Sequence, residues 1–95
     1  MYYIKGHGWV RILSSARKHG VADGDIIHVL VHAVLSLMAM EEGPGVTLHL
    51  GADAAGRLTE IITVRDTEEV TRVIHAMPMR RKYVPYLTED RRHDR

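Results

Sequence analysis

Apolar residues dominate one long stretch of the chain, residues 26–40, which polar side chains interrupt at a regular interval. The polar positions in and just before this stretch are three or four residues apart: Asp25, His28, His32 and Ser36. Such positions form one narrow stripe on an α-helix, so the pattern predicts a helix over residues 24–40 with Asp23 as its N-cap. The rest of this helix is apolar, which is more than one buried face requires. Either both flanks of this helix pack inside the domain, or one flank is a contact surface for a second copy or for another protein.

The segment before this helix is shorter and more polar. Ser14 or Ser15 can cap a short helix that continues to Lys18, and Gly20 suits the left-handed residue that follows a helix. Residues 1–13 contain strand-forming side chains but also two glycines that break a long element. We therefore expect them to form either an irregular segment or an edge strand.

Three runs with strand character follow the long helix, over residues 46–51, 57–65 and 70–77. The connections between them are about five and about four residues long, which suits β-hairpins. The order of elements predicts an α+β fold, with a three- or four-stranded antiparallel sheet and two helices packed on one face.

Side-chain alternation along the strands indicates which face of that sheet is buried. With hairpin turns near residues 52–56 and 66–69, one face collects most of the aliphatic side chains. Its aliphatic members include Leu48, Leu50 and Ile62. We expect the helices to cover this face. Glu60 and His75 are the polar residues on it, and this register places them opposite each other.

The C-terminal part of the chain is basic. Residues 79–87 are predicted to form a short helix or turn, because Pro85 disfavours a long helix. Residues 88–95 are charged throughout and have no apolar anchor, which predicts a disordered tail. The expected organisation is thus a single domain over residues 14–87, preceded by the N-terminal segment and followed by the tail.

The composition is that of a globular protein, with 45% hydrophobic and 26% charged residues in a chain of 95. This length allows one modest core and is too short for a Rossmann or barrel enzyme. The absence of cysteine excludes disulfides, iron–sulfur clusters and zinc fingers, and it fits a reducing cytoplasm. No signal-peptide pattern is visible, and the longest apolar run is too short to span a bilayer. We therefore expect a soluble, cytoplasmic protein without membrane contact.

The charge is unevenly distributed although the formal net charge is only +1. Residues 1–20 carry four cations and no acid, residues 21–69 carry nine acids, and residues 70–95 carry seven cations against three acids. If the two basic ends meet in space, they form a positive surface suited to a phosphate-rich partner. The alternative is that both ends are simply solvated.

The pair of Glu60 and His75 is the first candidate for chemistry. A carboxylate beside an imidazole orients the ring, which suits a general acid or base. The alternative is a satisfied buried polar pair that fixes the strand register.

A second candidate is the cluster of Arg80, Arg81, Lys82 and Tyr83. Guanidinium groups bind phosphate oxygens through two hydrogen bonds and stabilise charge that develops in phosphoryl transfer. Tyr83 and nearby Tyr86 offer surfaces on which unpaired bases can stack. An ordinary solvated basic terminus is the alternative.

His28 and His32 have the spacing at which two histidines on one face of a helix bind a metal ion. The sequence shows no third ligand for such a site, and the glutamate that follows the first histidine in the known zinc motif is missing. We therefore expect no metal and no cofactor. The glycine-rich turns lack the lysine and hydroxyl residue of a phosphate-binding loop, and the chain has no cysteine nucleophile.

Several of these motifs occur together in one known family. The sequence Arg17-Lys18-His19-Gly20-Val21, the sequence Gly56-Arg57-Leu58 at the start of a strand, and the Arg80-Arg81 pair after the last strand resemble the BrnT family of toxin–antitoxin ribonuclease toxins. The resemblance covers about residues 17–83 and implies a RelE-like fold.

The resemblance also implies an activity, which is metal-independent cleavage of mRNA through attack of the RNA's own 2′-hydroxyl. It implies phosphate contacts from Lys18, Arg57, Arg80 and Arg81, to which the basic cluster adds Lys82. His19 or His75 is the implied proton-transfer group, with Glu60 orienting His75 and Tyr83 as a further proton donor. The implied partner is a cognate antitoxin of the ribbon-helix-helix, BrnA-like type. A non-catalytic module that binds RNA or protein on the same scaffold is the alternative.

Overall fold

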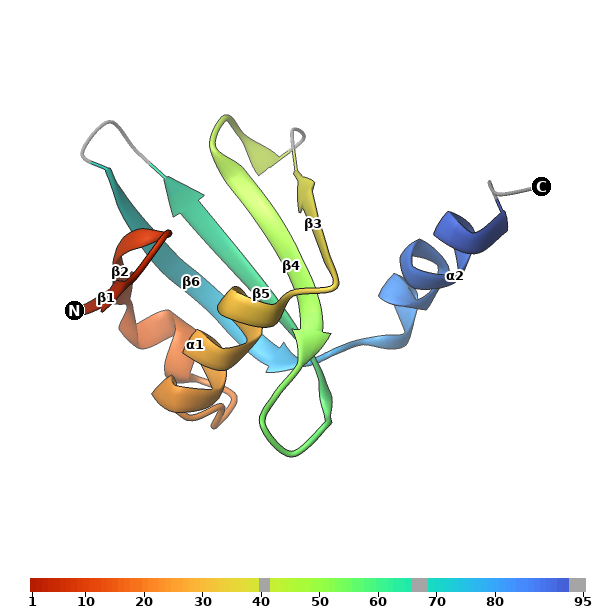
Figure 1. Ribbon diagram of the computed structural model, residues 1–95, viewed down its shortest axis with the longest axis horizontal. Helices are drawn as coiled ribbons and strands as arrows, with labels where there is room; N and C mark the ends of the chain where they lie inside the picture. The colour runs from red at the N-terminus through yellow and green to blue at the C-terminus, as the bar shows by residue number, and fades with distance from the viewer. Residues whose placement is uncertain (40–41, 66–68, 93–95) are drawn as a thin grey trace.

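A computed structural model of the protein describes residues 1–39, 42–65 and 69–92 (Figure 1). The strands are β1 (Tyr2–Ile4), β2 (Gly8–Ile12), β3 (Leu35–Met38), β4 (Val46–Ala52), β5 (Leu58–Arg65) and β6 (Val70–Pro78). The α-helices are α1 (Asp23–His32) and α2 (Val84–Arg92), and the short 3₁₀ helices are η1 (Ser14–Arg17) and η3 (Arg81–Tyr83).

All the described strands belong to one sheet in the order β1-β2-β6-β5-β4-β3. β2 runs parallel to β6, and the other neighbours are antiparallel. The α+β class is therefore confirmed, but the sheet is six-stranded and mixed rather than a three- or four-stranded antiparallel one. The additional strands come from residues 1–13, which form the β1–β2 hairpin, and from β3.

The predicted helix over residues 24–40 is wrong in its second half. α1 ends at His32, Ala33 turns to an extended conformation, and the Val34 N–H donates to the Leu50 carbonyl to start the pairing of β3 with β4. The apolar surplus of the predicted helix is thus explained, because part of it belongs to a strand of the sheet. The helical contact surface expected over residues 24–40 does not exist in that form.

α1 begins with Asp23 itself, and the N-cap is Ala22 without a side-chain bond. The Asp23 carboxylate is instead held by Arg17, at 2.8 Å, and by the Tyr2 hydroxyl, at 2.7 Å. These bonds tie α1 to η1 and to β1, and they hold the pKa of Asp23 below its usual value.

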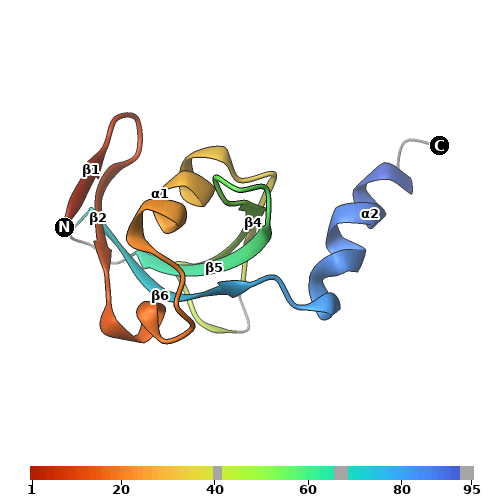
Figure 2. The ribbon, with the colours of Figure 1, turned by 90° about the horizontal axis from the view of Figure 1, so that it is seen from below.

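α1 packs on the face of the sheet opposite to the one that we expected to be covered (Figure 2). The core beneath it contains Ile61, Val73 and Ala76 together with Ile26 and Val29 of α1. Gly51 also faces the helix, where a Cβ atom would lie 3.1 Å from the Ala33 Cα. The absence of a side chain at Gly51 therefore lets α1 approach β4 closely at this point.

β4 and β5 keep the expected alternation, but the expected pairs do not form, and β6 changes its alternation between Val73 and His75. Leu50 lies opposite Glu60, and Glu60 in turn lies opposite Met77 rather than His75. A β-bulge interrupts the pairing of β5 with β6, because Ile62 pairs with His75 while Thr63 pairs with Val73.

Only one of the two helices covers the sheet. α2 projects away from it beyond the end of β6, as Figures 1 and 2 both show. The expected packing of two helices on one face is therefore wrong for α2. Residues 88–92, where we expected a disordered tail to begin, form the last part of α2, and residues 93–95 lie outside the described part of the chain.

Candidate functional site

A groove lies on the open face of the sheet, the face that α1 does not cover. It has a volume of about 710 Å³ and is bounded by β3, β4, β5 and β6 and by the segment from Arg80 to Tyr86. Its aliphatic side consists of Leu37, Met38, Ala39, Leu48 and Ile62, and its polar side consists of His75, Arg80, Lys82, Tyr83 and Tyr86 together with one carboxylate, that of Glu42. Four of the residues that the sequence suggested for chemistry thus line one groove: His75, Arg80, Lys82 and Tyr83.

The β-bulge explains why His75 points into this groove. Val73 is fully buried in the core beneath α1, and residues two apart in a regular strand point to the same face. The extra residue in β6, Ile74, reverses that alternation, so His75 lies on the open face beside Ile62. The bulge therefore serves two purposes, because the same short segment supplies a core residue and a site residue.

Glu60 lies under the groove and holds two of its polar residues. The His75 Nε2 atom is 2.8 Å from Glu60 Oε2, and the Arg80 guanidinium donates to the same carboxylate with Nη2 at 2.7 Å. The Arg80 backbone N–H adds a bond of 2.9 Å to Oε1. The Glu60 side chain is completely buried, whereas those of His75 and Arg80 are 22% and 42% exposed. The expected contact of Glu60 with His75 is confirmed, although the two are not opposite each other in the sheet.

These bonds decide the charge of Glu60. Burial by itself raises the pKa of the Glu60 carboxyl, but the bonds from Arg80 and His75 outweigh burial and hold that pKa below its usual value. The pKa of Arg80 is raised in turn by its bond to Glu60. The carboxylate and the guanidinium are therefore both charged at neutral pH, and the His75 ring is fixed in orientation by an anion.

Aromatic and basic side chains form the rim of the groove beside Arg80. The rings of Tyr83 and Tyr86 are stacked with centroids 5.9 Å apart. The Arg80 guanidinium carbon is 5.6 Å, and the Lys82 ammonium 5.1 Å, from the centre of the Tyr83 ring. This combination of positive charge and flat rings suits a nucleotide, whose phosphate and base need these two kinds of contact.

His19 is the second histidine at this site. It follows η1, which lies along β6, and its ring is 5.8 Å from the ring of His75 between centroids. His19 does not line the groove itself; it lines a smaller hollow of about 350 Å³ beside the starts of α1 and β5. The two histidines are therefore close enough to contact the same phosphodiester group.

The structure does not bring every predicted phosphate-binding residue to the groove. Arg57 lines the smaller hollow and pairs with Asp53 at 3.0 Å, and the Arg57 backbone N–H is the largest cause of the lowered pKa of Asp53. Lys18 and Arg81 are exposed but line none of the described pockets. Among the predicted phosphate contacts, only Arg80 and Lys82 line the groove.

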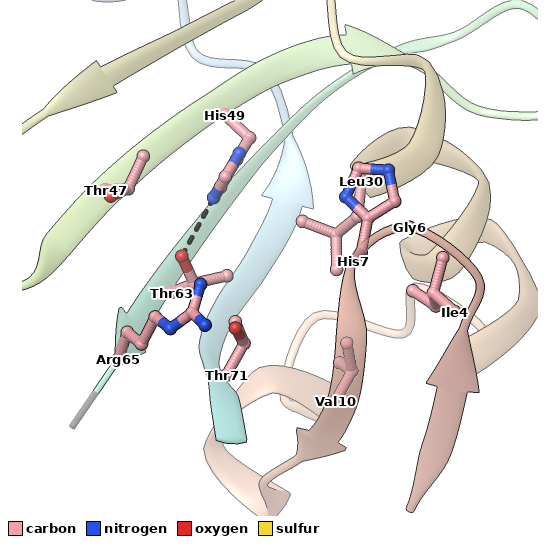
Figure 3. A pocket seen from close by; sticks show the side chains of 10 residues that line it. All are labelled: Ile4, Gly6, His7, Val10, Leu30, Thr47, His49, Thr63, Arg65 and Thr71. Atoms are coloured by element: carbon pink, nitrogen blue, oxygen red, sulfur yellow. Dashed lines mark hydrogen bonds between the residues drawn. The ribbon is translucent and has the colours of Figure 1, made fainter. Parts of the chain in front are cut away.

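A polar pocket that the sequence did not reveal lies beside α1, with a volume of about 270 Å³ (Figure 3). His49 bridges two strands there, with Nδ1 2.9 Å from Ser36 Oγ and Nε2 2.8 Å from Thr63 Oγ1. Burial, and secondarily the charge of His7, lowers the pKa of His49 to about 4. The alternation of Thr47 and His49 with aliphatic residues was a signal for this pocket, but it was masked by our choice of the opposite face as the core.

His28 and His32 lie side by side on α1 with ring centroids 4.5 Å apart. Within the described residues, no group of three histidine, cysteine or acidic side chains is arranged to hold a metal ion.

No helix in the described part of the chain is both long and apolar enough to span a membrane. Comparisons with models of protein families, with curated proteins and with solved structures find no match to this chain.

Proposed function

We propose that the protein is the toxin of a type II toxin–antitoxin pair, a metal-independent endoribonuclease similar to the BrnT family on a RelE-like scaffold. The observation that carries the proposal is the network of Glu60, His75 and Arg80 at the floor of the open groove, with His19 beside it. A histidine fixed by a buried carboxylate, a second histidine and a guanidinium are the groups that RNA cleavage through the 2′-hydroxyl requires.

His75 takes the role of general base in this proposal. Since Glu60 accepts a hydrogen bond from Nε2, that nitrogen carries the proton and Nδ1 carries the lone pair. Nδ1 removes the proton of the 2′-hydroxyl, whose oxygen then attacks the adjacent phosphorus. Glu60 acts through His75 and is a positioning residue.

The phosphate must be stabilised as the attack proceeds. The phosphorus becomes five-coordinate, and its oxygens gain negative charge that Arg80 and Lys82 neutralise at the groove. The bond from phosphorus to the 5′-oxygen then breaks, and protonated His19 gives its proton to that oxygen. Tyr83 is an alternative donor. The products are a 2′,3′-cyclic phosphate and a free 5′-hydroxyl, so no water and no metal enter this step.

The groove also suits the partner that the family resemblance implies. Met38 is 69% exposed, Tyr86 is 45% exposed, and both line the aliphatic and aromatic sides of the groove. An antitoxin of the ribbon-helix-helix, BrnA-like type that covers these side chains also covers His75 and Arg80. Inhibition then requires no conformational change, because the partner occupies the place of the RNA.

The test is cleavage of a labelled RNA by the purified protein in EDTA. We expect products that end in a 2′,3′-cyclic phosphate, and a loss of rate of about 10²–10⁴ for His75→Gln, which is typical when a general base is removed. His28→Gln is the matched control, because His28 lies on α1 and lines no part of the groove. Products that end in a 3′-hydroxyl, or a His75→Gln variant with the rate of the original protein, would contradict the proposed chemistry.

A binding module is the second candidate, and one observation favours it. The Nε and Nη2 atoms of Arg80 are already bound to Glu60, which leaves only part of the guanidinium for a phosphate. If both the original protein and His75→Gln bind RNA equally and neither cleaves it, with or without ribosomes, the module replaces the enzyme.

A further inference from the structure

The polar pocket beside α1 lies on the other face of the sheet from the groove (Figure 3). Val10, which is buried in the core beneath α1, and Leu30 of α1 itself both line it. Whatever binds in this pocket is therefore separated by the sheet from the candidate catalytic groups.

The floor of the pocket is a row of threonines on three adjacent strands. Thr47 of β4 and Thr63 of β5 are register partners, and Thr71 lies on the next strand, β6. On β5 and β6 these threonines stand two positions from the core residues Ile61 and Val73, so they point to the same face. The face thus changes from aliphatic groups to hydroxyl groups, which can both donate and accept hydrogen bonds.

All three hydroxyl groups can donate to a ligand. Those of Thr47 and Thr71 have no hydrogen-bond partner among the described residues. Thr63 Oγ1 is 2.8 Å from Nε2 of His49, and Nδ1 of that ring is 2.9 Å from Ser36 Oγ. Because burial lowers the pKa of His49 to about 4, the ring is neutral at neutral pH and carries one N–H. With this N–H on Nε2, the ring donates to Thr63 Oγ1 and leaves the hydroxyl proton of Thr63 for the pocket.

Positive charge comes from Arg65 at the end of β5. Arg65 is the register partner of Thr71, and its guanidinium extends over the floor toward Thr63 and Thr71 (Figure 3). No group in the described part of the chain pairs with this guanidinium. His7, from the turn between β1 and β2, lines the pocket as well, and the described lining residues include no carboxylate. The pocket therefore presents hydrogen-bond donors and a cation without a compensating anion.

This set of groups matches an oxyanion with several acceptor atoms. A guanidinium binds two phosphate oxygens at once, and hydroxyl groups bind the others. The volume of about 270 Å³ is just below the range of about 300–1,000 Å³ of sites for drug-sized ligands, so it suits a small group. We propose that this pocket binds a phosphate group, held by the Arg65 guanidinium and the three threonine hydroxyl groups, with His7 at its edge. The phosphate belongs either to inorganic phosphate or to a small phosphomonoester, and the inference does not depend on the proposed function.

The test is a titration of the ¹⁵N-labelled full chain with inorganic phosphate at pH 7, with chloride keeping the ionic strength constant. We expect saturable shifts of the amide signals of the threonine row, with a Kd on the order of 1 mM or tighter. Chloride alone should leave these signals in place. Because each signal belongs to one residue, binding at this pocket is distinguished from binding at Arg80 in the groove.

Variants identify the charged and the neutral contacts separately. Arg65→Gln should weaken the affinity for phosphate at least about tenfold, as the loss of a charged hydrogen-bond donor does. Thr71→Val keeps the shape of the side chain but removes one hydroxyl, which should weaken the affinity about two- to tenfold. Arg11→Gln is the matched control. Arg11 is exposed and alternates with buried Val10 and Ile12, so it points to the other face and its loss should leave the affinity unchanged.

A second titration, with uridine 5′-monophosphate, identifies the source of the phosphate group. Tighter binding of the nucleotide at the threonine row assigns the pocket to a phosphomonoester, and tighter binding of inorganic phosphate assigns it to the free ion. If neither shifts these signals, or if the shifts are equally large in Arg65→Gln, the threonines are only the solvated end of a sheet face and the inference is overturned. Shifts confined to the groove overturn it as well. None of these results bears on the proposed ribonuclease, which is tested by cleavage with His75→Gln.

Discussion

Glu60 and Arg80 are twenty residues apart in the chain, yet the Glu60 carboxylate accepts hydrogen bonds from both the side chain and the backbone N–H of Arg80. The backbone bond fixes where the chain goes after β6, and the guanidinium bonds fix the side chain above the sheet. One buried carboxylate therefore positions the end of the sheet, the cation of the groove and, through Nε2, the ring of His75.

Replacing that carboxylate tests its structural role. Glu60→Gln keeps the shape but removes the charge, so Arg80 loses its charged partner and the amide cannot satisfy all three donors. We expect a loss of about 1–3 kcal/mol in the free energy of unfolding, measured in urea at neutral pH. Arg80 remains partly solvated, which keeps this loss below that for a fully buried pair. Glu42→Gln, at an exposed position, is the control and should be nearly neutral.

Glu60 also makes the free energy of unfolding depend on pH under acidic conditions. Its folded pKa is lower than the usual value of 4.5, so the unfolded chain binds its proton first. The carboxylate therefore contributes stability above about pH 4.5, and this contribution is lost as the pH falls through the folded pKa. In Glu60→Gln the free energy of unfolding should depend less on pH below 4.5. An equal dependence in both proteins would show that Glu60 is not held ionised by its neighbours.

The partly buried His49 should cause a loss of stability that begins at a higher pH than the loss due to Glu60. Its folded pKa of about 4 lies below the usual 6.5, so between these values the unfolded chain takes up a proton that the folded protein does not. Stability is fully present above about pH 6.5 and falls by about 2–3 kcal/mol as the pH drops to 4. His49→Gln should remove most of this fall. Ser36→Ala removes a hydrogen-bond partner but keeps the imidazole, so it should retain the fall.

The sequence was sufficient for the hairpins of β4, β5 and β6, because alternation and turn residues are local signals. It was not sufficient for the end of α1, since residues 33–38 are apolar enough for either a helix or a strand and only their pairing with β4 decides. The covered face was assigned wrongly for a related reason. Both faces carry aliphatic residues, and the deciding feature is the close approach of α1 to Gly51, which depends on residues far apart in the chain.

The Glu60–His75 contact shows how a correct site can follow from an incorrect register. Parity alone places both residues on one face, and a diagonal pair is still within reach of a long side chain. The bulge that produces this arrangement has no local signal such as a glycine in residues 73–75, so it could not be predicted. His19 was suggested by the family resemblance, and its position beside His75 depends on the parallel pairing of β2 with β6.

Two glycines with similar backbone angles provide a matched test of how tightly the chain packs where Gly45 meets Arg65. Gly45 has φ +79° and Gly20 has φ +78°, but only at Gly45 would a Cβ atom meet another group, the Arg65 carbonyl oxygen at 2.6 Å. Gly20→Ala should cost about 1 kcal/mol of stability for the backbone conformation alone. Gly45→Ala should cost roughly 2–4 kcal/mol, because the start of β4 must also move away from β5. Equal losses in urea unfolding would show that this turn relaxes freely.

The projecting position of α2 predicts that the core does not need it. α2 begins at Val84 and leads away from the sheet, whereas Val10 and Ile12 near the other end of the chain are part of the core (Figure 2). A chain that ends after Tyr83 should therefore keep a cooperative thermal transition within a few degrees of the original. Removal of residues 1–12, a deletion of the same size, should abolish that transition, because it exposes the β6 edge and uncovers Val73. If the shorter C-terminus instead unfolds the protein, α2 packs on the sheet in solution, and the groove is then closed by the chain itself.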